Sequence, residues 1–278
     1  MNLKIIISIF LIVIIHTVSY SQINDTIDYK ITYELEFKEL KNSELKQKEK
    51  MFLFISKNHS KFISEGKYKI DSLMASENVK QLSFSEFMRN IPKTKFDFFV
   101  INVLGSNKIL FHQKILKDKF FYEESINHNW TNHKNTKQIL GYNCKKATVS
   151  YQGRNYTAWY SNDIPVSTGP YKFYGLPGLI FEIYDSKKEY HFLIKGIESL
   201  SNEHILNFNP KNYIQVSKKD YEQTKEKLNE NPIKMLEQSG ISLDFSNELQ
   251  KKSLIDSHKE KMKNNNPIEL KDDGEKQM

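Results

Sequence analysis

The chain has 278 residues and carries 41 Lys and Arg against 34 Asp and Glu, which gives a formal net charge of +7. Its arginines are Arg89 and Arg154, and the lysines are mixed with acidic residues along the chain. A nucleic-acid-binding surface is expected to be clustered and rich in arginine, so the composition excludes a nucleic-acid partner. The single cysteine, Cys144, excludes an intramolecular disulfide. We expect it to be a small buried hydrophobic residue rather than a nucleophile.

The first 21 residues have the features of a secretory signal peptide. Lys4 supplies positive charge, residues 5–15 form a nearly continuous apolar run, and Ser19 and Ser21 place small side chains before Gln22. The run has the length of a signal core and is short for a membrane helix. We predict cleavage before Gln22, with an uncleaved anchor as the alternative. No transmembrane span is expected after signal removal. The predicted location is the periplasm, the outer cell surface or the extracellular medium.

Strand patterns dominate residues 22–210. From Ile27 to Phe37 apolar and polar residues alternate, which predicts a strand with one buried face. Residues 96–116, 142–161 and 179–197 each contain two apolar runs around a turn, which predicts three hairpins. Because hairpins pair antiparallel strands, we predict a mainly β domain, a curved antiparallel sheet that is bowl-like or a half-barrel.

After residue 209 aromatic residues become rare, and Lys, Glu, Gln and Asn dominate. A helix is predicted from Lys218 to Leu228 with Ser217 as its N-cap. A second helix begins at Pro232 and ends before Gly240, and residues 247–263 could form a third. We predict that residues 211–270 pack on the β domain as a few short helices with irregular segments. Residues 271–278 are predicted to be a disordered polar tail.

Residues 159–185, which read WYSNDIPVSTGPYKFYGLPGLIFEIYD, are rich in conformationally special residues. The tetrapeptide Leu176-Pro177-Gly178-Leu179 suits a type II turn, because proline presets the second position and glycine supplies a positive φ at the third. We predict a rigid double turn that leads into a core strand. The residues of this structural motif are Gly169, Pro170, Gly175, Leu176, Pro177 and Gly178.

The blocks GYNCKKATVSYQGRNYTAWY (141–160), DIP (163–165), GPYKFYGLPGLI (169–180) and NNPIEL (265–270) occur in this order. On these blocks the chain resembles the GLPGLI family of exported proteins from the Bacteroidota. The resemblance implies a β-rich fold and brings no catalytic residue, because the family is largely uncharacterised. Some members resemble a bowl-like module found beside a bacterial glycan-removing amidase, and that analogy does not give function.

Aromatic residues crowd around the same loop and form the candidate binding residues. Exposed aromatic side chains on a rigid loop commonly bind sugars or peptides, so these residues could form a binding lip. Their exposure cannot be read from the sequence, and the structural reading of the loop is favoured over the binding one. The candidates are Trp159, Tyr160, Tyr171, Phe173 and Tyr174.

The sequence holds no recognised catalytic, metal or cofactor motif: G-x-S-x-G, H-E-x-x-H, the P-loop and the dinucleotide fingerprint are all missing. His128 and His133 lie five positions apart in a polar stretch, which is weak evidence for a metal site. Asp163, Glu182 and Asp185 flank the aromatic loop, and two carboxylates at a fixed separation could serve glycoside hydrolysis. We expect Glu182 to face water instead. We predict no catalytic residue, no metal site and no cofactor.

The leading hypothesis is an exported, non-catalytic binding or carrier protein for an apolar, peptide or glycan ligand. The inner face of a curved sheet could hold such a ligand. One alternative is a hydrolase acting on envelope glycans or peptides, which requires converging carboxylates or a Cys–His pair. The other is an accessory partner of an outer-membrane receptor, which requires a large exposed apolar patch.

Overall fold

The computed structural model describes residues 22–76, 83, 85–86, 89, 91–200, 204–240 and 243–270. The predicted signal peptide (1–21) and the predicted polar tail (271–278) lie outside the described residues. Across the described ranges, every helix is too short or too polar to span a bilayer.

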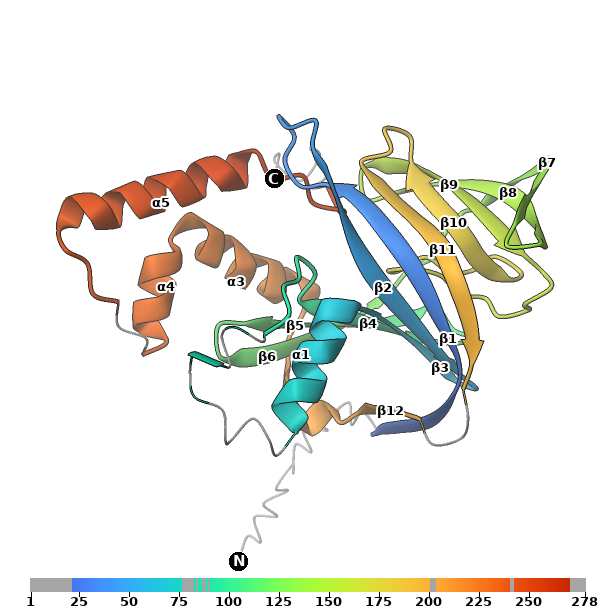
Figure 1. Cartoon of the computed structure of the whole chain (residues 1–278), viewed down its shortest axis with the longest axis horizontal. Helices are drawn as coiled ribbons and strands as arrows, with labels where there is room; N and C mark the ends of the chain where they lie inside the picture. Colours follow the sequence, from blue (N-terminus) through green and yellow to red (C-terminus); the bar gives the residue numbers. More distant parts are fainter. Residues whose placement is uncertain are drawn as a thin grey trace, which may run out of the picture.

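The fold is mainly β, as predicted, and is built on one large curved antiparallel sheet (Figure 1). The sheet has 13 strands in the order β13-β6-β5-β4-β3-β2-β1-β11-β10-β9-β8-β7, with β12 attached to β1. The short pairing of β13 with β6 is parallel. The strands are β1 (Ile23–Lys38), β2 (Lys46–Ser56), β3 (His59–Ser64), β4 (Phe98–Val103), β5 (Lys108–Ile115), β6 (Asp118–Ser125), β7 (Thr131–Ile139), β8 (Tyr142–Tyr151), β9 (Arg154–Ser161), β10 (Leu179–Asp185), β11 (Tyr190–Ser199), β12 (Ile205–Phe208) and β13 (Ile214–Gln215).

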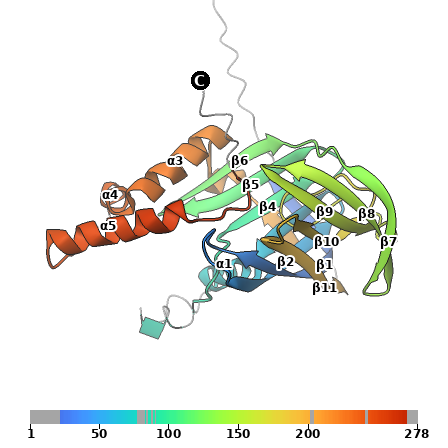
Figure 2. The same cartoon turned by 90° about the horizontal axis from the view of Figure 1, so that it is seen from above.

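The described helices are α1 (Glu65–Ala75), α3 (Lys218–Glu230), α4 (Pro232–Gln238) and α5 (Glu248–Lys263), with a single 3₁₀ turn at Pro210–Asn212. The three predicted C-terminal helices are confirmed, and Ser217 caps α3 by accepting a hydrogen bond from Asp220 N–H. Seen from above, α3, α4 and α5 lie together to one side of the sheet (Figure 2). Helix α5 contains no buried residue, so packing of its own side chains contributes little to its position.

The predicted alternation of β1 decides which side of the sheet carries the main core. Ile31, Tyr33, Leu35 and Phe37 are all buried on the inner face, where they join the larger hydrophobic cluster. A β-bulge between Ile27 and Tyr29 interrupts the pairing of β1 with β2. Because one extra residue reverses the facing of a strand, Ile27 belongs to a second, outer cluster instead.

The outer cluster covers the other face of β2 to β6. Leu206 and Phe208 of β12 pack over it, and the ring of Tyr213 adds to the cover. His112 of β5 is buried in this apolar setting, stacked on Phe99 with ring centroids 4.2 Å apart. Burial lowers the pKa of His112 to about 2, so its ring is neutral at physiological pH.

Residues 162–178, called here the signature loop, connect β9 to β10 by crossing the inner face of the sheet. Thr168 Oγ1 lies 2.7 Å from Ser60 Oγ of β3. Further along, the Tyr174 hydroxyl donates to the carbonyl of Asn107, at 2.9 Å, in the turn between β4 and β5. The loop therefore joins the β7–β11 half of the sheet to the β3–β6 half.

The end of the signature loop differs in detail from the predicted type II turn. The closing hydrogen bond of such a turn would run from Leu179 N–H to Leu176 O. Instead, Leu179 N–H donates to Ile164 O at 3.0 Å, and Gly178 N–H donates to Leu176 O at 2.8 Å. Leu179 is the first residue of β10. Its amide pairs with Ile164, near the start of the loop, and is therefore not available to close the turn. The glycine is required for space: a Cβ at Gly178 would lie 2.0 Å from Ser161 O.

Replacing Gly178 by alanine should therefore lower the free energy of unfolding by about 2–3 kcal/mol, because the backbone must shift to accommodate the methyl group. Gly196→Ala is the matched control, since a Cβ there meets no atom within 4 Å and should change stability by less than about 1 kcal/mol. Urea unfolding measures both. Equal stability of the two variants would contradict the close approach.

Candidate functional site

The aromatic residues proposed from the sequence lie mostly inside the protein. Tyr160 of β9 is buried in the main core, and so are Tyr171, Phe173 and Tyr174, because the signature loop crosses the inner face of the sheet. Trp159 is half-buried, with the Lys137 ammonium 4.4 Å from its ring centroid. The five residues therefore do not form an exposed aromatic lip, and a role for them in binding stays a prediction.

The three carboxylates proposed for hydrolysis have separate surroundings. Asp163 is exposed. Glu182 is 7% exposed rather than facing water as expected. Burial opposes ionisation of Glu182, but hydrogen bonds from His191 and Lys137 outweigh it and lower the pKa of the carboxyl. Asp185, three residues further along β10, is buried and paired with Arg154. Each acid is thus held by its own partner or by solvent.

Cys144 and the histidines give no support for nucleophilic or metal chemistry. Cys144 is fully buried, and this burial raises the pKa of its thiol to about 11, so a thiolate is unfavourable. His128 Nε2 lies 2.9 Å from Lys172 O, whereas His133 Nε2 lies 2.8 Å from Thr148 Oγ1. Within the ranges that the structure describes, no three His, Cys, Asp or Glu side chains are grouped so as to hold a metal ion.

A different site lies at one rim of the sheet, where β1 ends and β9 and β11 begin. There residues 264–270, called here the strap, follow α5 and run along the rim. Backbone hydrogen bonds hold both ends of the strap. They are Lys41 N–H to Asn264 O (2.7 Å), Asn266 N–H to Glu39 O (3.0 Å) and Leu270 N–H to Gln152 O (3.0 Å), with an antiparallel bridge between Leu40 and Asn265.

Side chains of the sheet bind three successive carbonyl groups of the strap. The Tyr190 hydroxyl donates to Asn266 O at 2.6 Å. One terminal nitrogen of Arg154 donates to Pro267 O at 2.8 Å, and the Tyr156 hydroxyl donates to Ile268 O at 3.3 Å. We call Arg154, Tyr156 and Tyr190 the rim donors. The three donors thus bind consecutive main-chain carbonyls of a segment that bends at Ile268 and Glu269.

Contacts other than those with the strap hold the Arg154 side chain in place. Its side chain is 3% exposed, and its other terminal nitrogen donates to Glu189 at 2.8 Å and to Asp185 at 3.3 Å. The guanidinium carbon lies 5.0 Å from the centre of the Tyr190 ring. A buried arginine needs such partners, because an unpaired charge in the interior is costly. The strap therefore meets a donor that is already oriented.

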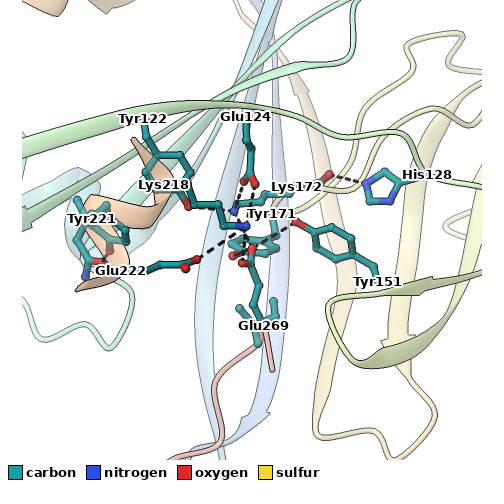
Figure 3. A network of polar contacts seen from close by, with 12 residues as sticks. Tyr122, Glu124, His128, Tyr151, Tyr171, Lys172, Lys218, Tyr221, Glu222 and Glu269 are labelled. Carbon is teal, nitrogen blue, oxygen red and sulfur yellow. Dashed lines mark hydrogen bonds and ion pairs between the residues drawn. The ribbon is translucent and has the colours of Figure 1, made fainter. Parts of the chain in front are cut away.

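Glu269 of the strap enters a buried cluster of charged and phenolic side chains (Figure 3). Lys172 of the signature loop is fully buried, and its ammonium pairs with Glu269 at 2.6 Å and with Glu124 of β6. Lys218 at the start of α3 pairs with the same two carboxylates, at 3.4 Å and 2.9 Å. Two cations and two anions thus share one site.

Phenolic hydroxyls complete the surroundings of the Glu269 carboxylate. Tyr171 donates to it at 2.6 Å and Tyr151 at 3.3 Å. Burial first, and then the nearby carboxylates, raise the pKa of both phenols, so they stay protonated and act as donors. We call Lys172, Lys218, Tyr151 and Tyr171 the carboxylate pocket. Because Glu124 balances one of the two ammonium groups, the pocket offers one further positive charge and two phenolic donors to a carboxylate.

Glu269 is ionised in the folded protein. Burial alone would raise its pKa, but Lys172 and Lys218 outweigh that effect and bring the pKa down to about 2 from 4.5. Because the folded-state value lies below the unfolded one, the resulting stabilisation is present above about pH 4.5 and is lost as the pH falls toward 2. The pocket therefore holds Glu269 as a carboxylate at neutral pH.

The sequence signals for this site are incomplete. Arg154 is one of two arginines and NNPIEL is one of the blocks that carry the family resemblance, but neither pattern predicts a site. Lys172 lies between two aromatic candidates and carries no signal of its own. Only pairing across the fold brings Lys172 and the strap together, and no spacing in the sequence encodes that contact.

Replacing Lys172 by methionine should lower the free energy of unfolding by about 3 kcal/mol or more, because Glu124 and Glu269 would remain buried with less compensation. Adding Glu269→Gln should recover part of the loss. Lys263→Met is the control, since Lys263 and its partner Glu260 are largely exposed and the change should stay within about 0.5 kcal/mol. Chemical denaturation tests all three, and additive losses in the double variant would contradict the coupling.

Comparison with known proteins gives one family match and distant structural matches. The family model described as "Protein of unknown function (Porph_ging)" matches residues 150–182, which include Arg154, Tyr156 and Lys172. It does not carry the name GLPGLI. No curated protein sequence matches the chain.

The chain is similar to solved structures of PNGF-II in the P21 and C2 space groups, at 15% and 14% identity and TM-scores of 0.48 and 0.49. Each match covers 71% of this chain and 32% of the PNGF-II chain, so the chain spans about a third of that protein.

Proposed function

We propose that this chain is an exported, non-catalytic binding protein of the bacterial cell envelope that holds a peptide segment at the rim formed by β1, β9 and β11. We also infer membership of the GLPGLI family, since the matched residues 150–182 include the GLPGLI string. The observation that carries the binding proposal is the arrangement of the rim donors. Arg154, Tyr156 and Tyr190 reach three consecutive carbonyls, and the strap is the peptide that occupies them in this chain.

A peptide fits this structure better than an apolar ligand does. An apolar ligand would need open space along the inner face, and there the signature loop packs into the main core. Ile268 of the strap also packs against this core. A peptide needs donors for its carbonyls, because polar main-chain groups taken out of water must be hydrogen-bonded. The rim supplies such donors at successive positions.

A hydrolase is not favoured, because Asp163, Glu182 and Asp185 are engaged separately. The accessory-partner function has one supporting observation. Leu249 and Leu254 of α5 are exposed, at 78% and 51%, and Leu243 just before this helix is 40% exposed. Exposed apolar side chains can mark a contact with another protein, so helix α5 is our second candidate for a protein-binding surface.

A labelled peptide with the sequence of residues 264–270 should bind in trans to full-length protein whose own strap is weakened by Glu269→Gln. Adding Tyr156→Phe and Tyr190→Phe should weaken binding at least about tenfold, because two hydrogen bonds to the peptide carbonyls are removed. Tyr184→Phe is the matched control, since this half-buried tyrosine lies outside the rim. Fluorescence anisotropy gives the affinities. Failure of the peptide to bind the folded, strap-weakened protein would refute the function.

Export is tested separately on protein recovered from its own host. Mature protein in the envelope or medium should begin at Gln22, because Ser19 and Ser21 provide the small residues that signal peptidase requires. Intact mass and amino-terminal sequencing identify the first residue. Protein that retains Met1 and fractionates with the cytoplasm would contradict export without affecting the binding proposal.

A further inference from the structure

The rim contacts side chains of the strap as well as its main chain. Contacts to carbonyl groups are independent of sequence, whereas contacts to side chains select residue types. Three strap positions make such selective contacts: Asn266, Glu269 and Leu270. The spacing of these positions defines a short sequence motif.

Both ends of the Asn266 amide are recognised. Its Oδ1 accepts from Arg154 at 2.6 Å, and its Nδ2 donates to Lys38 O at 2.9 Å. The side chain is 2% exposed. An aspartate here would place a negatively charged oxygen against the Lys38 carbonyl with no donor between them. Arg154 is already paired with Asp185 and Glu189, so it has no charge left to neutralise an aspartate. The site therefore selects asparagine over aspartate.

The carboxylate pocket selects an acidic residue three positions later. Without Glu269, the ammonium groups of Lys172 and Lys218 would face the Glu124 carboxylate and, at 4.0 Å from Lys218, the largely exposed Glu222. A neutral glutamine could accept hydrogen bonds from Tyr151 and Tyr171 but could not balance the second cation. Charge-assisted hydrogen bonds are roughly twice as strong as neutral ones, so a carboxylate is strongly preferred.

Two further features fit the same segment. A Cβ at Gly153 would lie 2.9 Å from Leu270 Cβ, so the glycine makes room for the side chain that follows the acidic residue. Pro267 restricts Asn266 to extended backbone conformations, which presets the backbone of Asn266 ahead of the bend at Ile268 and Glu269. Its own ring is exposed, so other residues are tolerated at this position.

We propose that the rim recognises, in trans, segments of other polypeptides with the motif Asn-Xaa-apolar-Glu-apolar, and that Asn266 to Leu270 is the chain's intramolecular copy of this motif. This inference rests on the peptide-binding function proposed above. The strap then acts as a built-in competitor that an incoming segment must displace. A competing segment of matching sequence gains the same contacts that the strap loses.

The test compares labelled peptides on one protein, the full-length Glu269→Gln variant, after circular dichroism confirms its fold. The peptides have the sequence of residues 264–270, the same sequence with Gln in place of the Glu, and the same with Asp in place of the third Asn. We expect each change to weaken binding at least about tenfold. Adding Lys218→Met to the protein should shrink the preference for Glu over Gln, whereas Lys219→Met, at an exposed neighbouring position, should leave it unchanged.

The outcomes separate the two proposals. If all three peptides bind equally well, the rim binds peptides but the motif is refuted. If none binds, the peptide-binding function itself fails. If the Glu269→Gln protein does not fold, the wild-type protein replaces it, with the peptides added in excess and strap release followed by hydrogen exchange of residues 264–270. Release by the unaltered peptide and not by the two altered peptides supports the motif, and equal release by all three refutes it.

Discussion

The buried ammonium group of Lys172 is the contact on which the arrangement of the whole protein depends. A charge taken fully out of water is tolerated only when it is paired and hydrogen-bonded. Its partners come from parts of the chain that are distant in sequence: Glu124 from β6 and Glu269 from the strap. Because Lys218 of α3 joins the same two carboxylates, this cluster connects the signature loop, β6, α3 and the strap.

The same requirement underlies the peptide binding that we propose for the rim. The strap follows α5, a helix without buried residues, so the strap is held mainly by its own contacts. Those contacts are hydrogen bonds and ion pairs to side chains that the sheet has already oriented, with Arg154 fixed by Asp185 and Glu189. Preorganised donors lower the entropic cost of binding. A surface built in this way holds the chain's own segment and is suited to hold another one.

The GLPGLI string has its physical explanation in the crossing of the inner face. Gly178 passes so close to Ser161 O that no side chain fits, and the Tyr33 hydroxyl donates to Ile180 O at 2.6 Å. The aromatic residues before the string fill the core instead of forming a lip. The loop is therefore structural along most of its length, and Lys172 is the residue through which it contributes to the carboxylate pocket.

The sequence by itself determined the features that depend on local patterns. Alternation predicted the buried face of β1, and cap residues such as Ser217 predicted the C-terminal helices, because facing and capping are decided within a few residues. It did not predict the bulge before Tyr29, the polar strand β7, the burial of Glu182 or the pairing of Lys172 with Glu269. Tertiary structure decided these features, because each depends on which distant segment lies opposite. The sequence contains many acidic residues that could pair with Lys172, and only the folded chain determines which of them do.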